Sequence, residues 1–266
     1  MGRIQVLVAT MHQHDCMSLI KNMNIRSDAI VVNQCDSYGY DIFDSNGNHV
    51  DMYSVQDRGL SRSRNTALIK SSAEFLCIAD DDMVYSNTYV EDIIHEFDKY
   101  KDADAIVFFV KPVNGRDSNI NVKRVGRLGR LEYKEFSSVE IVLRRDKLLA
   151  SNIWFNAIFG SGGIYNCGED SMFLKDMLNK GFRIYKSNIQ IATVDMSEST
   201  WFDGYNEKYF YNKGALVAAI YPNLWFLAIV VLSLKNSVRK LGDINKTKEL
   251  FLWYRAGALD YKRRVQ

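Results

Sequence analysis

The chain has 266 residues, of which 47% are hydrophobic and 25% are charged, with 34 Lys and Arg against 32 Asp and Glu. These values exclude an intrinsically disordered chain, a collagen-like repeat and a disulfide-rich scaffold. The four cysteines are widely spaced without a Cys-x-x-Cys pair, which predicts reduced thiols in a cytosolic protein. Residues 1–8 contain no long apolar run, so we expect no signal peptide.

The net charge of +2 is unevenly distributed along the chain. Residues 235–266 contain nine basic and three acidic side chains, which gives +6 and leaves −4 for residues 1–234. An acidic body argues against nucleic acid as the main ligand. The basic tail predicts peripheral association with the anionic inner face of the cell membrane, and the alternative is a solvated helical face that packs on the body.

Over the first 110 residues, short apolar runs alternate with helical patterns. This order predicts βαβ units and an α/β fold with a mainly parallel sheet flanked by helices. Ligands bind at the carboxyl ends of the strands in such sheets. Strands are predicted at residues 4–9, 29–33, 50–55, 75–79 and 105–110, and helices at 16–23, 61–71 and 89–100.

The middle of the chain is less regular. Residues 111–135 are rich in Arg and Gly and predict a long loop or short hairpin at the sheet edge. Further strands are predicted at 137–144, 182–186 and 189–194, and helices at 146–151, capped by Asp146, and at 169–179, ended by Gly181.

The C-terminal part is predicted to be helical from residue 206, which divides the chain into a catalytic domain at 1–205 and a helical extension at 206–266. Residues 215–234 carry no formal charge and reach the length of a membrane span. Pro222 and Asn223 interrupt them, which favours two short helices over a span.

Three consecutive carboxylates, Asp80, Asp81 and Asp82, follow the fourth predicted strand. Like charges this close repel one another, and a bound divalent cation such as Mg²⁺ or Mn²⁺ offsets this repulsion. Strand alternation would place Asp80 and Asp82 on one side, where they can share the ion, and Asp81 on the other. Alternatively, the acids interact with the dipole of the helix that follows.

Gly59 precedes a predicted helix whose first turns carry Arg62 and Arg64. Backbone amides at a helix N-terminus, together with arginine, can bind a phosphate group. The alternative is an ordinary helix with solvent-exposed arginines.

Glu169 and Asp170 begin another predicted helix, downstream of the flexible run Gly-Ser-Gly-Gly at 160–163. A carboxylate at such a junction can deprotonate a hydroxyl that is held against it. Acidic residues in the first turn also stabilise a helix through its dipole, so the pattern alone leaves both interpretations open.

Several other kinds of site are excluded by missing motifs. The chain has no Gly-x-Gly-x-x-Gly after the first strand, no Gly-Lys-Ser/Thr phosphate loop and no Gly-x-Ser-x-Gly elbow. The four histidines show no metal-binding spacing with the cysteines, which argues against zinc.

Taken in order, these segments resemble the family 2 glycosyltransferases with the GT-A fold, especially the bacterial enzymes that build capsular and other surface polysaccharides. The resemblance covers residues 4–178 and continues more weakly to 215. Ser63 stands where the family usually has Ala. The segments that carry the resemblance are Val-Leu-Val-Ala-Thr at 6–10, Val-Val-Asn-Gln-Cys-Asp at 31–36, Gly-Leu-Ser at 59–61 with Arg64-Asn65, Asp-Asp-Asp at 80–82 and Gly-Glu-Asp at 168–170.

The resemblance implies an inverting, metal-dependent transfer of a sugar from a nucleotide sugar, favoured as a uridine diphosphate (UDP) sugar, to a saccharide or lipid-linked saccharide. It implies Asp170 as the catalytic base, with Glu169 orienting donor or acceptor, and Asp82, with Asp80, as ligands of Mg²⁺ or Mn²⁺. The implied donor-binding residues are Thr10 and Asp36 near the base, Asp80 near the ribose, and Gly59, Arg64 and Asp81.

The sequence departs from the family pattern in the expected metal ligands. Many GT-A enzymes have a late His as a further ligand, but no His follows His95 here. Asp195, Ser199, Thr200 or Trp201 occupies that region, so we expect weak metal binding in the absence of donor.

Two other functions compete with glycosyl transfer. A sugar-nucleotide-forming nucleotidyltransferase would need a glycine-rich, lysine-bearing loop after the first strand, and residues 10–14 lack one. A non-catalytic saccharide-binding protein at the membrane is the third possibility, against which the intact acidic motifs argue.

Overall fold

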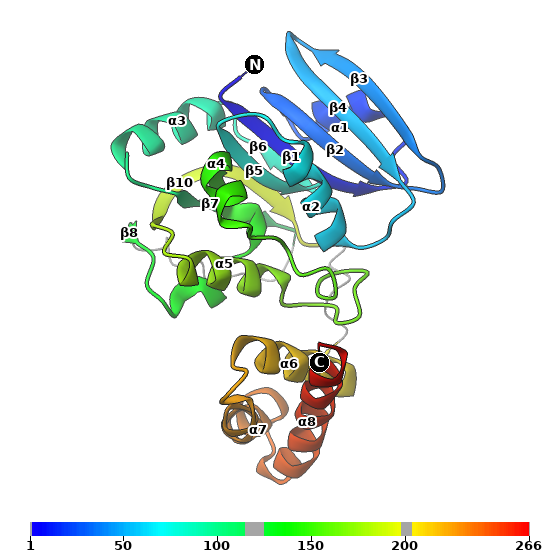
Figure 1. Cartoon of the computed structure of the whole chain (residues 1–266), viewed down its shortest axis with the longest axis vertical. Coiled ribbons are helices and arrows are strands. Elements are labelled where there is room, and N and C mark those ends of the chain that lie inside the picture. The colour runs from blue at the N-terminus through cyan, green and yellow to red at the C-terminus, as the bar shows by residue number, and fades with distance from the viewer. Residues whose placement is uncertain (1, 115–124, 198–203, 266) are drawn as a thin grey trace.

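The computed structural model describes residues 2–114, 125–197 and 204–265. Within these residues, strands from across the chain form one mixed sheet with helices on both faces (Figure 1). The C-terminal helices, here called the helical unit, lie together at one end of the long axis.

The strands are β1 (Ile4–Met11), β2 (Asp28–Gln34), β3 (Gly39–Ser45), β4 (Asn48–Val55), β5 (Phe75–Asp80), β6 (Met83–Tyr85), β7 (Ala105–Val113), β8 (Gly126–Arg127), β9 (Ile141–Arg144) and β10 (Ile184–Asp195). The α-helices are α1 (Cys16–Asn22), α2 (Leu60–Lys70), α3 (Tyr89–Lys99), α4 (Arg145–Ser151), α5 (Glu169–Asn179), α6 (Glu207–Ile220), α7 (Trp225–Leu241) and α8 (Thr247–Arg264). Short 3₁₀ turns cover Glu132–Glu135, Ser138–Glu140 and Ile244–Lys246.

The sheet has the strand order β3-β4-β2-β1-β5-β9-β7-β10-β6, and β8 pairs with β10 beside this path. Strands β4, β2, β1, β5, β7 and β10 run in one direction, and the other four described strands run against them. The predicted α/β fold with a mainly parallel core is therefore confirmed. The carboxyl ends of β1, β2, β4 and β5 lie side by side at one edge.

Apolar residues of the central strands alternate between two cores. Val6 and Val8 of β1 pack on the side of α1 and α3, whereas Leu7 packs on the side of α2 and α5. Both faces are covered, so the central strands read as continuous apolar runs in the sequence. The second core extends to Leu216 of α6, which joins the helical unit to the sheet domain. The domain boundary at 205 stays a prediction.

Some local predictions were wrong. Strands β3 and β6 were not predicted, and β3 pairs with β4 through a tight turn in which Asn46 and Gly47 have φ values of 55° and 81°. The N-cap of α4 is Arg144, and Asp146 lies inside the first turn. The strand predicted at 137–144 begins as a 3₁₀ turn, because Ser137 and Glu140 form a capping box. The two strands predicted at 182–194 are one irregular strand, β10.

In the 111–135 segment, residues 115–124 lie outside the described residues, and the rest forms the end of β7, the short strand β8 and a 3₁₀ turn. The predicted break at Pro222 is confirmed, since α6 ends at Ile220 and α7 begins at Trp225. Among the described residues, no helix is both long enough and apolar enough to cross a membrane.

Helices α6 and α8 approach each other closely through two glycines. A Cβ atom added to Gly214 would lie 2.0 Å from the carbonyl oxygen of Tyr254, and one added to Gly257 would lie 1.9 Å from that of Tyr211. Each glycine therefore faces the backbone of the opposite helix. The pairing is reciprocal and leaves no room for any larger residue.

We expect Gly214→Ala to lower the free energy of unfolding by about 3 kcal/mol, because the new methyl group must push the two helices apart. Helix propensity alone favours Ala over Gly by about 1 kcal/mol inside a helix. A fall in the unfolding free energy would therefore show that the close packing outweighs helix propensity. Urea denaturation measures the free energy of unfolding of each variant. Gly39→Ala is the control, since its Cβ would meet only the Ser54 side chain, at ordinary distances of 3.6 and 3.9 Å. Equal stability of both variants would refute the close packing.

Candidate active site

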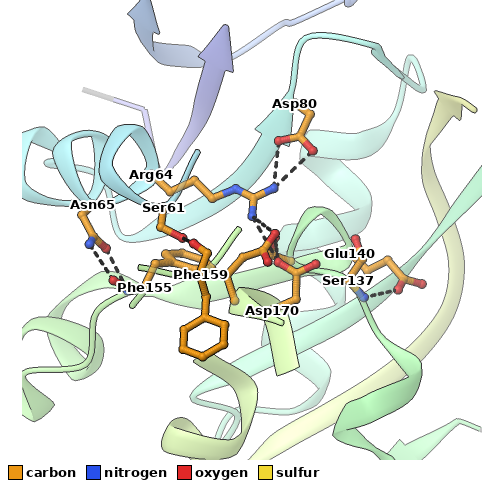
Figure 2. Close-up of polar contacts among 11 residues, drawn as sticks. Ser61, Arg64, Asn65, Asp80, Ser137, Glu140, Phe155, Phe159 and Asp170 are labelled. Atoms are coloured by element: carbon orange, nitrogen blue, oxygen red, sulfur yellow. Dashed lines mark hydrogen bonds and ion pairs between the residues drawn. The ribbon is translucent and has the colours of Figure 1, made fainter. Parts of the chain in front are cut away.

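A buried arginine on α2 joins three carboxylates from two separate segments. Arg64 Nη2 donates to both oxygens of Asp80, at 2.9 and 3.2 Å, and Nη1 donates to Asp170 Oδ1 at 3.1 Å (Figure 2). Glu169 Oε1 lies 3.7 Å from the same Nη1. Only 3% of the Arg64 side chain is exposed. The end of β5 and the start of α5 are thereby held together.

Hydrogen bonds from α2 position the loop that leads to α5. The Ser61 hydroxyl donates to the carbonyl oxygen of Phe159 at 2.7 Å. The Asn65 amide exchanges two 2.8 Å hydrogen bonds with the backbone of Phe155, as Figure 2 shows. Because α2 also carries Arg64, the same helix orients both the loop and the carboxylates.

Two backbone amides at the N-terminus of α2 already have hydrogen-bond partners within the protein. The Gly59 amide donates to Gln34 Oε1 at 2.7 Å, and the Leu60 amide donates to the carbonyl oxygen of Ser161 at 2.9 Å. Gly59 has a φ of 126°, a conformation that favours glycine. Of the two arginines, Arg62 is exposed and Arg64 is buried.

Burial and charge repulsion raise the pKa of Glu169 to about 7, with Asp170 as the nearest like charge. Arg64 opposes this shift only in part. Burial disfavours the charged guanidinium, but Asp80, Asp170 and Glu169 outweigh it, so the pKa of Arg64 is raised. The site therefore holds more negative than positive charge.

Ser138 was missed by the sequence analysis because it falls within a segment predicted as a strand. Its hydroxyl is buried and donates to Asp170 Oδ1 at 2.6 Å. Arg64 donates to the same oxygen. Among the described residues, the hydrogen bonds to the Asp170 side chain converge on Oδ1, and Oδ2 is left for another partner.

The three aspartates diverge where β5 ends. Asp80 is the last strand residue and pairs with Arg64, whereas Asp81 and Asp82 form a turn. The predicted strand alternation therefore does not apply beyond Asp80. Thr10, at the end of β1, donates to Asp81 Oδ2 at 2.6 Å. The structure thus brings Thr10, Asp80 and Asp81 to the same sheet edge.

Asp82 lies at the surface, yet partial burial of its carboxylate and the neighbouring Asp80 and Asp81 raise its pKa to about 6. Asp195, at the end of β10, adds to this effect, and its amide donates to the Asp82 carbonyl oxygen at 3.1 Å. The alternatives at 199–201 lie outside the described residues. Among the described residues, no three His, Cys, Asp or Glu side chains form a ready-made metal cage.

Asp36 follows β2 and is exposed, where it forms an ion pair with Arg58. Its carbonyl oxygen accepts from Gln56 Nε2 at 2.8 Å. Because β1 and β2 are adjacent and parallel, Asp36 and Thr10 lie at the same sheet edge. This arrangement is compatible with the predicted nucleobase end of the site.

Comparison with known proteins decides the family. The model for glycosyl transferase family 2 matches residues 27–164, which are 138 of the 266 residues. The chain belongs to glycosyl transferase family 2. It is therefore a glycosyltransferase. No curated protein sequence matches the chain.

Solved structures of S. aureus TarS share the GT-A fold of this family 2 enzyme. The TarS 1–349 complex with UDP-GlcNAc is 16% identical, covers 99% of this chain and 90% of its own, and has a TM-score of 0.63. The TarS 1–349 complex with UDP is 17% identical, with coverages of 99% and 92% and a TM-score of 0.61. The structure of TarS matches over 98% of this chain and 54% of its own. At this identity the likeness concerns the fold.

The raised pKa of Glu169 predicts a pH dependence of stability. The folded state binds this proton more tightly than the unfolded state, whose pKa is 4.5, so the stabilisation is complete below pH 4.5 and disappears as the pH rises to 7. We expect the Glu169 carboxyl to account for a fall of about 3 kcal/mol in the unfolding free energy over this range.

Chemical denaturation at pH 5 and pH 7 measures this fall. The fall in unfolding free energy should be smaller in Glu169→Gln than in the wild type. In Glu91→Gln, which alters an exposed acid on α3, the fall should equal that of the wild type. An equal fall in Glu169→Gln and the wild type would show that Glu169 titrates normally.

Proposed function

We propose that this glycosyltransferase is inverting and metal-dependent, and transfers a sugar from a UDP-sugar to a saccharide or lipid-linked saccharide in surface polysaccharide synthesis. The observation that carries the proposal is the Arg64 contact, which brings Asp80 beside Glu169 and Asp170 at the carboxyl edge of the sheet. Such edges bind ligands in α/β folds. The shared fold of TarS, solved with UDP-GlcNAc, supports a UDP-sugar donor.

The donor would lie across the ends of β1, β2 and β5. Thr10 and Asp36 are assigned to the nucleobase end, and Asp80 and Asp81 to the ribose and diphosphate end. Arg64 was expected to contact the donor, but its guanidinium already binds carboxylates on both sides and is buried. We assign it to positioning Asp80 and Asp170.

The carboxylates at the β5 turn fit a Mg²⁺ or Mn²⁺ ion. Partial burial, followed by the negative charges of Asp80 and Asp81, raises the pKa of Asp82, and a bound cation would offset those charges. Such an ion needs only one or two carboxylates when diphosphate oxygens and water complete its coordination. Asp82 would hold it, with Asp80 or Asp195 nearby, and the bound ion would offset the charge of the departing diphosphate.

Asp170 is assigned as the catalytic base. Arg64 and Ser138 fix its Oδ1, so Oδ2 is free to accept the proton of an acceptor hydroxyl. The acceptor oxygen then bonds to the anomeric carbon while the bond from that carbon to the diphosphate breaks, and UDP leaves with the electron pair. This single displacement inverts the anomeric configuration.

Glu169 is the rival base, since its pKa of about 7 suits proton transfer at neutral pH. Access favours Asp170, because its side chain is 25% exposed and that of Glu169 is 12% exposed. Glu169 also lies against the Gly160 backbone, where an added Cβ would come within 3.0 Å of its carboxyl carbon. We assign Glu169 to orienting donor or acceptor.

We expect Asp170→Asn to slow sugar transfer by about 10²–10⁴-fold, because the amide cannot take the acceptor proton. The dissociation constant for UDP, measured by calorimetry with Mn²⁺, should stay within a few-fold of wild type. Asp176→Asn on the exposed side of α5 is the matched control and should keep full activity. Loss of activity in Glu169→Gln with retention in Asp170→Asn would transfer the role to Glu169.

Chelation by EDTA should abolish UDP release, and Mn²⁺ should restore it. Asp82→Asn should raise the Mn²⁺ concentration for half-maximal rate at least about tenfold, since loss of even outer-shell partners weakens metal binding about 10–100-fold. Asp98→Asn, an exposed acid on α3, is the control. An Asp82→Asn enzyme with a wild-type Mn²⁺ requirement would remove Asp82 from the metal site.

We further propose that the enzyme works at the inner face of the cell membrane, where a lipid-linked acceptor would be held. The charge of +6 over residues 235–266 supports this location, because anionic lipid attracts basic segments.

A further inference from the structure

The helix α7 buries two polar side chains and exposes several large apolar ones. Its inward face buries two serines, Ser233 and Ser237, whose hydroxyls donate to carbonyl oxygens of their own helix at 2.6 and 2.9 Å. Its outward face exposes four apolar side chains. These residues, the outer stripe, are Leu227, Val231, Leu234 and Val238, exposed by 62%, 55%, 49% and 54%.

The outer stripe is continuous. Its members are spaced by four, three and four residues, so they lie on one face of the helix. Leu224 and Phe226, both exposed, extend the apolar surface at its N-terminal end. Single exposed apolar side chains are normal on a protein surface, whereas a contiguous patch indicates a binding surface.

Within the part of the chain that the structure describes, no other segment covers this stripe. The buried residue of α7 in the apolar core of the helical unit, Ile229, packs with residues of α6 and α8. In Figure 1, α6 lies between α7 and the sheet domain. The stripe therefore lies on the side of α7 away from the residues that pack with α6 and α8.

The charges around the stripe identify its partner. Helix α7 contains no acidic residue, and its C-terminal half carries Lys235, Arg239 and Lys240, all exposed. Lys246 and Lys248 follow directly and are also exposed. A second copy docked through its own α7 would bring no acidic side chain to these cations, which disfavours self-association. An anionic lipid surface satisfies both the apolar stripe and its basic border.

We propose that α7 lies in the plane of an anionic bilayer, with the outer stripe among the acyl chains and Lys235 and Arg239 at the headgroups. No described helix can cross the membrane, so this is an interfacial contact. The inference deepens the proposed membrane location, and it requires no assignment of the catalytic base or metal.

The contact would also orient the catalytic domain. Asp260 of α8 accepts a 2.7 Å hydrogen bond from the hydroxyl of Tyr165, which is fully buried. Tyr165 packs on Phe159, the residue whose carbonyl binds Ser61. The helical unit is thus joined to the loop that borders the catalytic carboxylates.

Flotation of the full chain with vesicles tests this inference. Vesicles of phosphatidylcholine with phosphatidylglycerol should bind the wild type, and those of phosphatidylcholine alone should bind it several-fold less, as should anionic vesicles in high salt. Leu227→Gln with Val231→Gln should reduce binding to anionic vesicles at least about tenfold. Ile69→Gln with Ile42→Gln changes equally exposed apolar residues of the sheet domain and should not reduce it.

Two results would overturn the inference. The first is equal vesicle binding by the Leu227/Val231 variant and the wild type. The second is a wild-type dimer in light scattering that the same variant dissociates, because the stripe would then bind a second copy. UDP-sugar hydrolysis in the absence of vesicles should be the same in all variants, so failure of the membrane contact and failure of the proposed chemistry are distinguishable.

Discussion

Arg64 places a positive charge where almost no solvent reaches it, and three carboxylates supply the opposite charge. Removing one partner from a buried ion pair is strongly destabilising, because the other charge is left uncompensated. Asp80 at the end of β5 must therefore lie beside Glu169 and Asp170 at the start of α5, although about 90 residues separate them in the chain. The same electrostatic constraint that stabilises this part of the fold assembles the proposed catalytic site.

The support of this site extends into the C-terminal helices. The aromatic rings of Phe159 and Tyr165 lie 5.0 Å apart between centroids, and Tyr165 donates to Asp260 of α8. Helix α8 in turn packs against α6 through Gly214 and Gly257, where backbone meets backbone. The helical unit thus contributes to the rigidity of the loop beside α5, and its outer face is free to contact another surface.

Features set by local pattern could be predicted from the sequence. The central strands were found because both faces of the sheet are buried, and the end of α6 because Pro222 cannot continue a helix. The acids at 80–82 and 169–170 were found from their positions at strand and helix ends. Features set by tertiary contacts could not be predicted. These include the mostly exposed strand β3, the hydroxyl of Ser138 on Asp170, and the difference in burial between Arg62 and Arg64.

The unfolding free energy of Arg64→Met at pH 7 tests the central claim most directly, since this substitution keeps a long, flexible side chain and removes its charge. Three carboxylates would be left without their cation, so denaturation should show a loss of about 3–5 kcal/mol. Arg62→Met, two residues away on the exposed side of α2, should change stability by no more than about 0.5 kcal/mol. An Arg64→Met protein as stable as the wild type would contradict the account.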